Sequence, residues 1–302
     1  MNIYEQVKSK FILPNAFEDW RSYRTQITER ILSIALHDLH MSEHKTMAIL
    51  GAGQCNDINL TECLNYYDYI TLIDEDSAAM EEAFQNISQE LQNRIIIKHA
   101  TLDGIISNDI ESMCQNILEY VKKRGLFLSK EEYLTYVTEQ LMIIKSLLYT
   151  NPEQLHSILP PKSYNLIVCL GVHSQLLSGL SYCLEILDYN ISQQLYQGTY
   201  SGMDIYHRIL TDMLNSIIPI LNQSIFDSSK GSIMIGCEYD DKHPIAGAYT
   251  SILDIRDRIH DHAAPANTNE QYNMTEEHLL WNFHSVNHIT YDMLIQTISV
   301  TV

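Results

Sequence analysis

The sequence predicts an α/β protein built on a doubly wound, mostly parallel sheet. The run from Tyr164 to Leu170 is apolar almost throughout, which is typical of a strand buried on both faces of a parallel sheet. A second apolar run, Met47 to Leu50, stops at a glycine-rich turn, as a buried strand does when it ends. Further strand-like runs alternate with stretches of helical periodicity along the 302 residues, which is the element order of βαβ units.

Residues 1–45 precede the first strand and are predicted to form a helical cap. Their apolar positions share one helical face with an arginine: Trp20, Tyr23, Arg24, Ile27 and Ile31. From this face the Arg24 guanidinium could pair with a carboxylate. In the alternative reading, its stem lies along the apolar stripe and its charged end reaches solvent.

The first predicted strand ends at Gly51-Ala52-Gly53. Glycine is favoured in such a turn because it adopts positive φ and lets the backbone approach a ligand closely. Asn56 or Asp57 is expected to cap the helix that follows. The turn therefore reads as the connection between a strand and a helix at a nucleotide site.

A second strand is predicted from Tyr69 to Ile73, and Asp74 follows it directly. Asp74 lies about 20 residues after Gly51, the spacing that places a carboxylate beside a glycine turn. There it can accept hydrogen bonds from both hydroxyls of a ribose. The third small residue of a dinucleotide fingerprint is missing, because Asn56 occupies that place.

The segment from Thr46 to Asp76 resembles motif I and the acidic ribose-binding position of the class I S-adenosylmethionine-dependent methyltransferases. This resemblance implies S-adenosylmethionine as cofactor and a seven-stranded Rossmann-like sheet of order 3-2-1-4-5-7-6. A nicotinamide-dinucleotide site and a purely connecting turn remain as alternatives. The methionine carboxylate of the cofactor would be the natural partner of Arg24. By resemblance, the cofactor-binding residues are Gly51, Ala52, Gly53, Asn56, Asp74, Glu75, Asp103, Arg24 and Leu170.

A third strand is predicted from Ile95 to Lys98, shortly before Asp103. In the resembled family the loop after this strand contacts adenine, so Asp103 could accept a hydrogen bond from the exocyclic amine. A loop aspartate that caps the next helix is the alternative.

The crossover over residues 104–161 is longer than one helix requires, so a helical insertion is predicted here. Its two helices are expected at Asp109–Arg124 and Lys130–Tyr149, separated by Gly125. Ser129 and Glu132 have the spacing of a capping box at the start of the second helix.

Two candidate catalytic residues lie at the ends of predicted strands. His173 follows the fourth strand, Tyr164–Leu170, and Glu238 ends the fifth strand, Ser232–Glu238. In open α/β sheets ligands bind at the carboxyl ends of the strands, so His173 and Glu238 are expected near the chemistry. Either side chain could remove a proton from an oxygen or nitrogen nucleophile. A lone histidine at a helix start can also be structural, and that alternative stays open for His173.

Residues 240–278 are the most polar and least patterned part of the chain and are predicted to be a lid or substrate loop. His260 and His262 flank an aspartate there, but alternating residues do not form a helical metal-binding pair, so we expect no metal. Trp281–Phe283 and Met293–Val302 are expected to form an antiparallel strand pair at the far edge of the sheet.

The amino-acid composition of the chain limits the classes of partner that it is expected to bind. The net charge of -19 and the pI near 4.9 oppose a phosphate-binding surface, so no nucleic-acid partner is expected. The six cysteines form no Cys-x-x-Cys pair and are predicted to be reduced and mostly buried. With neither a signal-peptide core nor a membrane-spanning run, we expect a soluble cytoplasmic protein without a membrane partner. A homodimer is one option for its assembly.

The sequence thus indicates an S-adenosylmethionine-dependent methyltransferase with a helical cap over 1–45 and an α/β domain over 46–302. The expected acceptor is an oxygen or nitrogen of a small molecule, and a protein side chain is less favoured. The alternatives are a binding protein that keeps the cofactor pocket without turnover, and a nicotinamide-dependent dehydrogenase.

Overall fold

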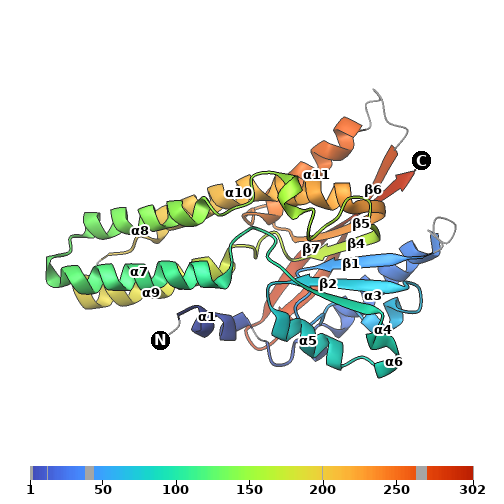
Figure 1. The fold of residues 1–302 in the computed structure, drawn as a ribbon, viewed down its shortest axis with the longest axis horizontal. Coiled ribbons are helices and arrows are strands. Elements are labelled where there is room, and N and C mark those ends of the chain that lie inside the picture. The colour runs from blue at the N-terminus through green and yellow to red at the C-terminus, as the bar shows by residue number, and fades with distance from the viewer. Residues whose placement is uncertain (1–2, 12, 38–43, 199, 263–270, 302) are drawn as a thin grey trace.

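A computed structural model describes residues 3–11, 13–37, 44–198, 200–262 and 271–301. Its centre is a seven-stranded sheet of order β3-β2-β1-β4-β5-β7-β6 (Figure 1). The strands are β1 (Thr46–Leu50), β2 (Tyr69–Asp74), β3 (Ile95–His99), β4 (Tyr164–Leu170), β5 (Ser229–Glu238), β6 (Gln271–His284) and β7 (Ile289–Thr301). The first five strands run parallel, and β7 pairs antiparallel with both β5 and β6. The predicted fold class and sheet order are confirmed.

Helices cover both faces of this sheet. One face packs on α3 (Arg21–His37), α4 (Leu60–Cys63) and α5 (Ser77–Gln85). The other face packs on the second half of α10 (Met203–Ser228), the short helix η3 (Pro152–Leu155) and α11 (Ala248–His262). Successive side chains of a strand point to opposite faces of the sheet, so each strand contributes to both cores. In β1, Met47 and Ile49 point to the first core, and Ala48 and Leu50 point to the second.

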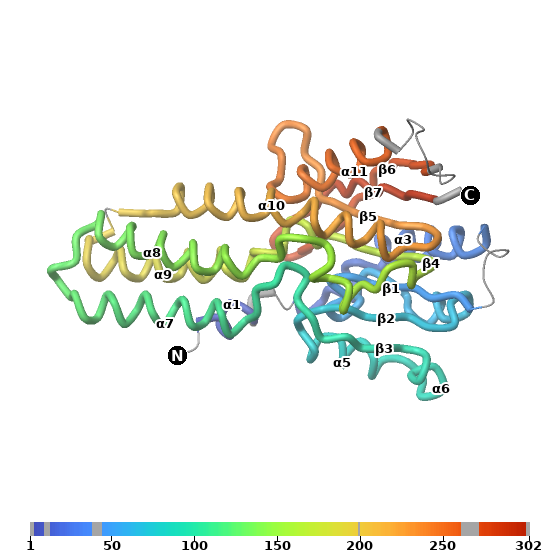
Figure 2. The backbone as a smooth tube through the Cα atoms, turned by 45° about the horizontal axis from the view of Figure 1, so that its top comes forward, coloured from blue at the N-terminus to red at the C-terminus, as the bar shows by residue number. Residues whose placement is uncertain are grey.

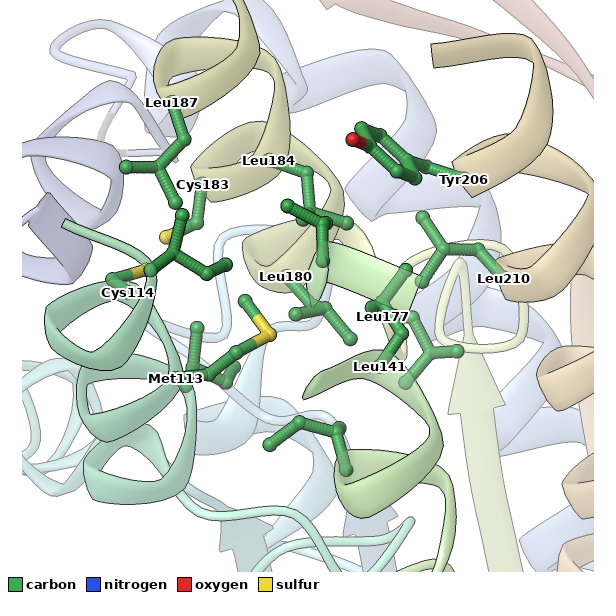
Figure 3. Packing of buried hydrophobic residues seen from close by; sticks show 14 of the residues in the cluster. Met113, Cys114, Leu141, Leu177, Leu180, Cys183, Leu184, Leu187, Tyr206 and Leu210 are labelled. Carbon is green, nitrogen blue, oxygen red and sulfur yellow. The ribbon is translucent and has the colours of Figure 1, made fainter. Parts of the chain in front are cut away.

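A helical arm extends beyond the sheet (Figure 2). It consists of α7 (Ser107–Arg124), α8 (Lys130–Lys145), α9 (Ser178–Tyr196) and the first half of α10, with η2 (Gly125–Phe127) joining α7 to α8. Leucines, methionines and cysteines from these helices interlock in a third core (Figure 3). The predicted capping box of α8 is present, with the Ser129 hydroxyl accepting from the backbone NH of Glu132 at 3.1 Å. The helical insertion predicted over 104–161 therefore forms half of this arm.

The described part of the N-terminal segment contains α1 (Ile3–Phe11), α2 (Ala16–Asp19) and α3. Tyr23, Ile27 and Ile31 are buried on one face of α3. A short helix, α6 (Gln89–Gln92), completes the described helices. None of the helices in these residue ranges is both long and apolar enough to cross a membrane.

Two expectations about local structure were wrong. The helix after the glycine turn is capped by Asn59, whose side chain accepts from the backbone NH of Glu62, rather than by Asn56 or Asp57. The stretch predicted as a lid, 240–278, contains α11 and the first residues of β6, while 263–270 lie outside the described residues. The helix was missed because only Ile252 and Ile255 of its core face stand out between charged side chains that face outward.

Candidate functional site

The glycine turn follows β1, at the point where the strand order of the sheet reverses. From β1 the chain passes to β2 on one side, and β4 pairs with β1 on the other side. Open α/β sheets bind ligands outside the carboxyl ends of strands at such a switch point. Gly51 and Gly53 have φ of 64° and 46°, conformations that glycine adopts without strain. A Cβ at Gly51 would lie 2.4 Å from Cγ2 of Val172, whereas one at Gly53 would meet no atom within 4 Å.

Asp74 is held beside this turn by backbone donors. One carboxylate oxygen accepts from the NH of Gly53 at 2.9 Å and the other accepts from the NH of Asp76 at 2.7 Å. Burial raises the pKa of Asp74, and these two hydrogen bonds oppose the rise. A carboxylate has about four lone-pair positions, so each oxygen can still accept from a ligand hydroxyl. The predicted proximity of Asp74 to the glycine turn is confirmed.

Two further carboxylates predicted for the cofactor lie on the same side of the turn. Glu75 accepts from the backbone NH of Ser107 at the start of α7. Asp103 is buried, and its Oδ1 accepts from the NH of Ile105 at 2.8 Å. Burial raises the pKa of Asp103 to about 6. Asp103 does not cap α7, because that helix begins only at Ser107, so this alternative is ruled out.

Arg24 binds the backbone of the segment that follows the glycine turn. Its Nη1 donates to the backbone oxygen of Phe17 at 2.6 Å and to that of Asn56 at 2.9 Å. The guanidinium also lies over the Phe17 ring, 3.8 Å from the centroid. At 8% exposure it does not extend into solvent, so that reading is wrong. Asp57, which follows the turn, has its pKa raised to about 6 by burial, and the nearby charge of Arg24 opposes this rise.

His173 lies behind the end of β4 in the interior. Its Nε2 is 2.9 Å from Oδ1 of Asn222, and its Nδ1 is 3.7 Å from Sγ of Cys237. The residue is 1% exposed, and burial lowers its pKa to about 4. A neutral imidazole with both ring nitrogens engaged by core residues cannot readily take a proton from an acceptor. This environment favours the structural alternative for His173.

Glu238 ends β5 at the same edge of the sheet. Its carboxylate is 5% exposed and accepts from the Ser174 hydroxyl at 2.8 Å. Burial raises its pKa, while hydrogen bonds from Ser174 and Gln175 lower it. No lysine or arginine in the described part of the chain forms an ion pair with it. Glu238 is therefore a buried base without a cation.

Aromatic side chains face one another beside Glu238. We name as the aromatic wall the five residues Trp20, Tyr23, Trp281, Phe283 and Tyr291. The Trp281 ring also lies against Gly171, 3.3 Å from where a Cβ of that glycine would be. The sequence placed Trp20 and Tyr23 on a helix and Trp281 on an edge strand, but it contained no signal that they meet.

The helix α1 packs against the arm and pairs with the segment after β2, a position that the sequence did not predict. Lys8 forms a 3.1 Å ion pair with Asp76, and the backbone NH of Tyr4 donates to Glu111 at 3.2 Å. Burial raises the pKa of the Tyr4 phenol, and the charges of Glu75 and Asp103 add to the effect. The Tyr4 side chain therefore lies close to residues predicted to bind the cofactor.

The sequence predicts no metal at His260 and His262, and this stays a prediction. His260 ends the described side chains of α11, and the side chain of His262 lies outside them. No group of three or more His, Cys, Asp or Glu side chains within the described ranges could hold a metal ion.

No protein-family model matches the chain, and no curated protein sequence matches it. Among solved structures it is similar to the magnesium protoporphyrin IX methyltransferase of Synechocystis with bound SAM, at 11% identity and a TM-score of 0.42, over 95% of this chain and 85% of that one. It is similar to the N-methyltransferase NodS of Bradyrhizobium japonicum with S-adenosylhomocysteine, at 12% identity and a TM-score of 0.41, over 99% and 98%. It is also similar to an O-methyltransferase of Bacillus cereus with S-adenosylhomocysteine, at 8% identity and a TM-score of 0.41, over 94% and 90%.

Proposed function

We propose that this protein transfers a methyl group from S-adenosylmethionine to an oxygen or nitrogen of a small molecule. The observation that carries the proposal is the pairing of the Gly53 turn with Asp74 at the switch point of the sheet. The carboxylate is fixed by two backbone NH groups and retains free lone pairs, while the glycine leaves open space beside it. A ribose with two adjacent hydroxyls fits this arrangement.

Other residues around the turn suit the rest of the cofactor. Asp103 is a buried acceptor for the exocyclic amine of adenine, and the charge of the nearby Glu75 adds to the rise of its pKa. Ala52 and Leu170 offer apolar surface at the strand ends. Arg24 acts on the cofactor through Asn56, whose backbone oxygen it binds, so we assign it a positioning role.

When bound, the cofactor supplies an electrophilic methyl group on its sulfonium, so no covalent enzyme intermediate is required. The task of the chain is to bind and orient the acceptor and to hold its proton. Glu238 is the base in this proposal, because its raised pKa favours proton uptake. His173 keeps Asn222 and Cys237 in place behind the strand ends, which orients the segment that leads to Ser174.

The buried, unpaired Glu238 also favours an enzyme over a protein that only binds the cofactor, since a binder has no need for a base there. Asn56 in place of a third small residue argues against a dehydrogenase, whose pyrophosphate needs close access to the helix. The net charge of -19 supports a small-molecule acceptor over nucleic acid.

A thermal-shift panel with S-adenosylhomocysteine, NADH, NADPH and ATP tests the proposal. We expect only S-adenosylhomocysteine to raise the melting temperature, because a ligand that binds the native state alone stabilises it. At about 100 times its dissociation constant the gain is about 2.7 kcal/mol. Stabilisation by NADH without stabilisation by S-adenosylhomocysteine would overturn the proposal in favour of a dehydrogenase.

Turnover is then measured with a labelled methyl donor and mixed small-molecule acceptors. Binding of S-adenosylhomocysteine without transfer to any acceptor would support the binding protein instead.

A further inference from the structure

The aromatic wall is a continuous set of ring contacts beside a carboxylate. Tyr23 stacks on Trp281 at 5.3 Å between centroids, and Trp20 meets the edge of Trp281 at 4.8 Å. Phe283 and Tyr291 lie 5.3 Å apart and continue the wall along β6 and β7. Glu238 of β5 pairs with Met293 of β7. Tyr291 lies two residues before Met293 on β7, so it is close to the strand position of Glu238.

Two buried polar groups at this place lack hydrogen-bond partners, and a buried carboxylate beside them lacks a cation. The hydroxyl of Tyr23 and the Nε1 of Trp281 have no hydrogen-bond partner in the described chain, at 2% and 5% residue exposure. Glu238 receives hydrogen bonds but no cation. An unsatisfied buried group costs about 1–3 kcal/mol, so two of them beside a buried carboxylate are unfavourable for packing alone. They are expected where a ligand completes the site.

Tyr23 lies near both halves of the site. The pKa of the Tyr23 phenol is raised chiefly by burial, and the charges of Asp57 and Glu238 add to it. The pKa of Tyr291 is likewise raised by burial and by Glu238. Tyr23 therefore lies between the glycine turn that Asp57 follows and the carboxylate of β5, where an acceptor would meet the cofactor.

The chemistry of the wall selects one kind of molecule. Aromatic faces attract a cation through the negative charge of their π-systems, and a buried carboxylate attracts it more strongly. The indole NH of Trp281 can only donate, so it requires an acceptor atom on the same ligand. The Glu238 carboxylate would repel a carboxylate ligand. An alcohol would leave the charge of Glu238 without a counter-ion.

We infer that the methyl acceptor is an amine, bound as its ammonium ion between Glu238 and the aromatic wall, with a neighbouring oxygen or nitrogen facing Trp281. This inference rests on the proposed function and specifies its substrate class. The site gives the ammonium a counter-ion at Glu238 and rings at Tyr23 and Trp281.

The reaction balances with groups that are present. The ammonium gives one proton to the Glu238 carboxylate, which leaves a neutral amine and a carboxylic acid. The nitrogen lone pair then forms a bond to the methyl carbon while the carbon–sulfur bond breaks, and the electron pair stays on sulfur. The products are a methylated ammonium ion and S-adenosylhomocysteine, and Glu238 returns its proton to solvent after release.

Intrinsic fluorescence provides a direct test, because Trp20 and Trp281 are the only two tryptophans of the chain and both belong to the wall. The protein is titrated with benzylamine, benzyl alcohol and benzoate under tryptophan-selective excitation, with and without saturating S-adenosylhomocysteine. We expect benzylamine to change the emission and to bind about tenfold or more tightly than the other two probes. Equal or tighter binding of benzyl alcohol or benzoate, or no response to benzylamine, would overturn the inference.

Glu238→Gln removes the charge and keeps the shape, so it should abolish the preference for benzylamine and leave the affinity for S-adenosylhomocysteine unchanged. Glu90→Gln, at an exposed position of α6, is the matched control and should keep the preference. A Glu238→Gln protein that still prefers the amine would contradict the assignment. Failure of the proposed function is seen separately, as the absence of S-adenosylhomocysteine binding in wild-type protein.

Discussion

A single carboxylate, Asp74, links the fold to the proposed cofactor. Its two backbone hydrogen bonds tie the end of β2 to the glycine turn after β1, so the same side chain shapes the turn and faces the ligand. Because the carboxylate is already oriented, binding a ribose requires no rearrangement of the backbone.

Asp74→Ala should weaken S-adenosylhomocysteine binding by about 1.5–3 kcal/mol, since a charged acceptor to two hydroxyls is lost. This corresponds to about a 10- to 150-fold rise in Kd, measured by isothermal titration calorimetry. Asp241→Ala, at an exposed position after β5, is the control and should bind like wild type. An unchanged Kd in a folded Asp74→Ala protein would show that Asp74 has only a structural role.

His173 makes stability depend on pH in one direction. Its pKa is lowered from 6.5 to about 4 in the folded protein, so the unfolded chain binds more protons between these values. The native state is therefore destabilised as pH falls through this window and is unaffected by this group above it. Asp57 and Asp103, with pKa values raised to about 6, act in the opposite sense.

A His173→Gln variant isolates this contribution, because the two aspartates titrate in both proteins. Between pH 7 and pH 4.5, wild type should lose about 2 kcal/mol more unfolding free energy than the variant. Chemical denaturation at both pH values measures the difference. Parallel losses in the two proteins would mean that His173 is not held neutral by burial.

At the level of single residues, the sequence predicted that Asp74 lies beside the Gly51–Gly53 turn, because this proximity depends on short-range spacing. It could not predict Tyr23 or Trp281 in the site, because their contact depends on how α3 packs on a strand far along the chain. For His173, the sequence showed its place after β4 but not that Asn222 and Cys237 would occupy its ring nitrogens.

Among the elements, α1 is the one whose position has a functional consequence. It joins the arm to the cofactor side through the ion pair of Lys8 with Asp76 and the bond of Tyr4 to Glu111. Ile3 and Val7 anchor α1 in the core of the arm, and the partly exposed Lys8 ion pair adds only about 0–1 kcal/mol, so ligand contacts would stabilise the helix further.

Hydrogen exchange of α1 should therefore slow when S-adenosylhomocysteine binds, by about tenfold if ligand contacts add about 1.4 kcal/mol to the closed state. Mass spectrometry of peptides from residues 3–11 reports the change, and peptides from α8 in the arm serve as the internal control. If exchange in α1 is unaltered while the ligand is bound, α1 is not part of the cofactor site.

Element prediction succeeded where apolar patterns were long and failed where charge masked them. The strands β1, β2 and β4 and the arm helices α7 and α8 lie close to their predicted ranges. In α11, Arg256 pairs with Glu276 of β6, and Arg258 donates to the backbone oxygen of Pro219 in α10, so charges that suggested a solvated loop in fact connect the helix to its surroundings.

The whole molecule carries a net charge of -19, which works against compactness through self-repulsion. Salt screens this repulsion, with a Debye length that falls from about 10 Å at 0.1 M to about 3 Å at 1 M. Raising NaCl over this range should therefore raise the melting temperature, by about 2–4 °C for each kcal/mol gained.

Differential scanning calorimetry measures the effect, and a sucrose series of equal osmolality separates charge screening from solvent exclusion. A melting temperature that is constant or falls with salt would show that the acidic residues are spread too widely to repel one another.

The aromatic wall joins residues that the ribosome makes far apart in time: the indole NH of Trp20 donates to the backbone oxygen of Phe283, 263 positions later. The glycine turn, Asp74 and Asp103 have all been synthesised four residues after the third strand is complete, but the wall cannot exist before β6 and β7 emerge. On the proposed function, the chain would acquire the residues for its cofactor long before it could hold an acceptor. A nascent chain would then gain methyl transfer only after its last two strands have joined the sheet.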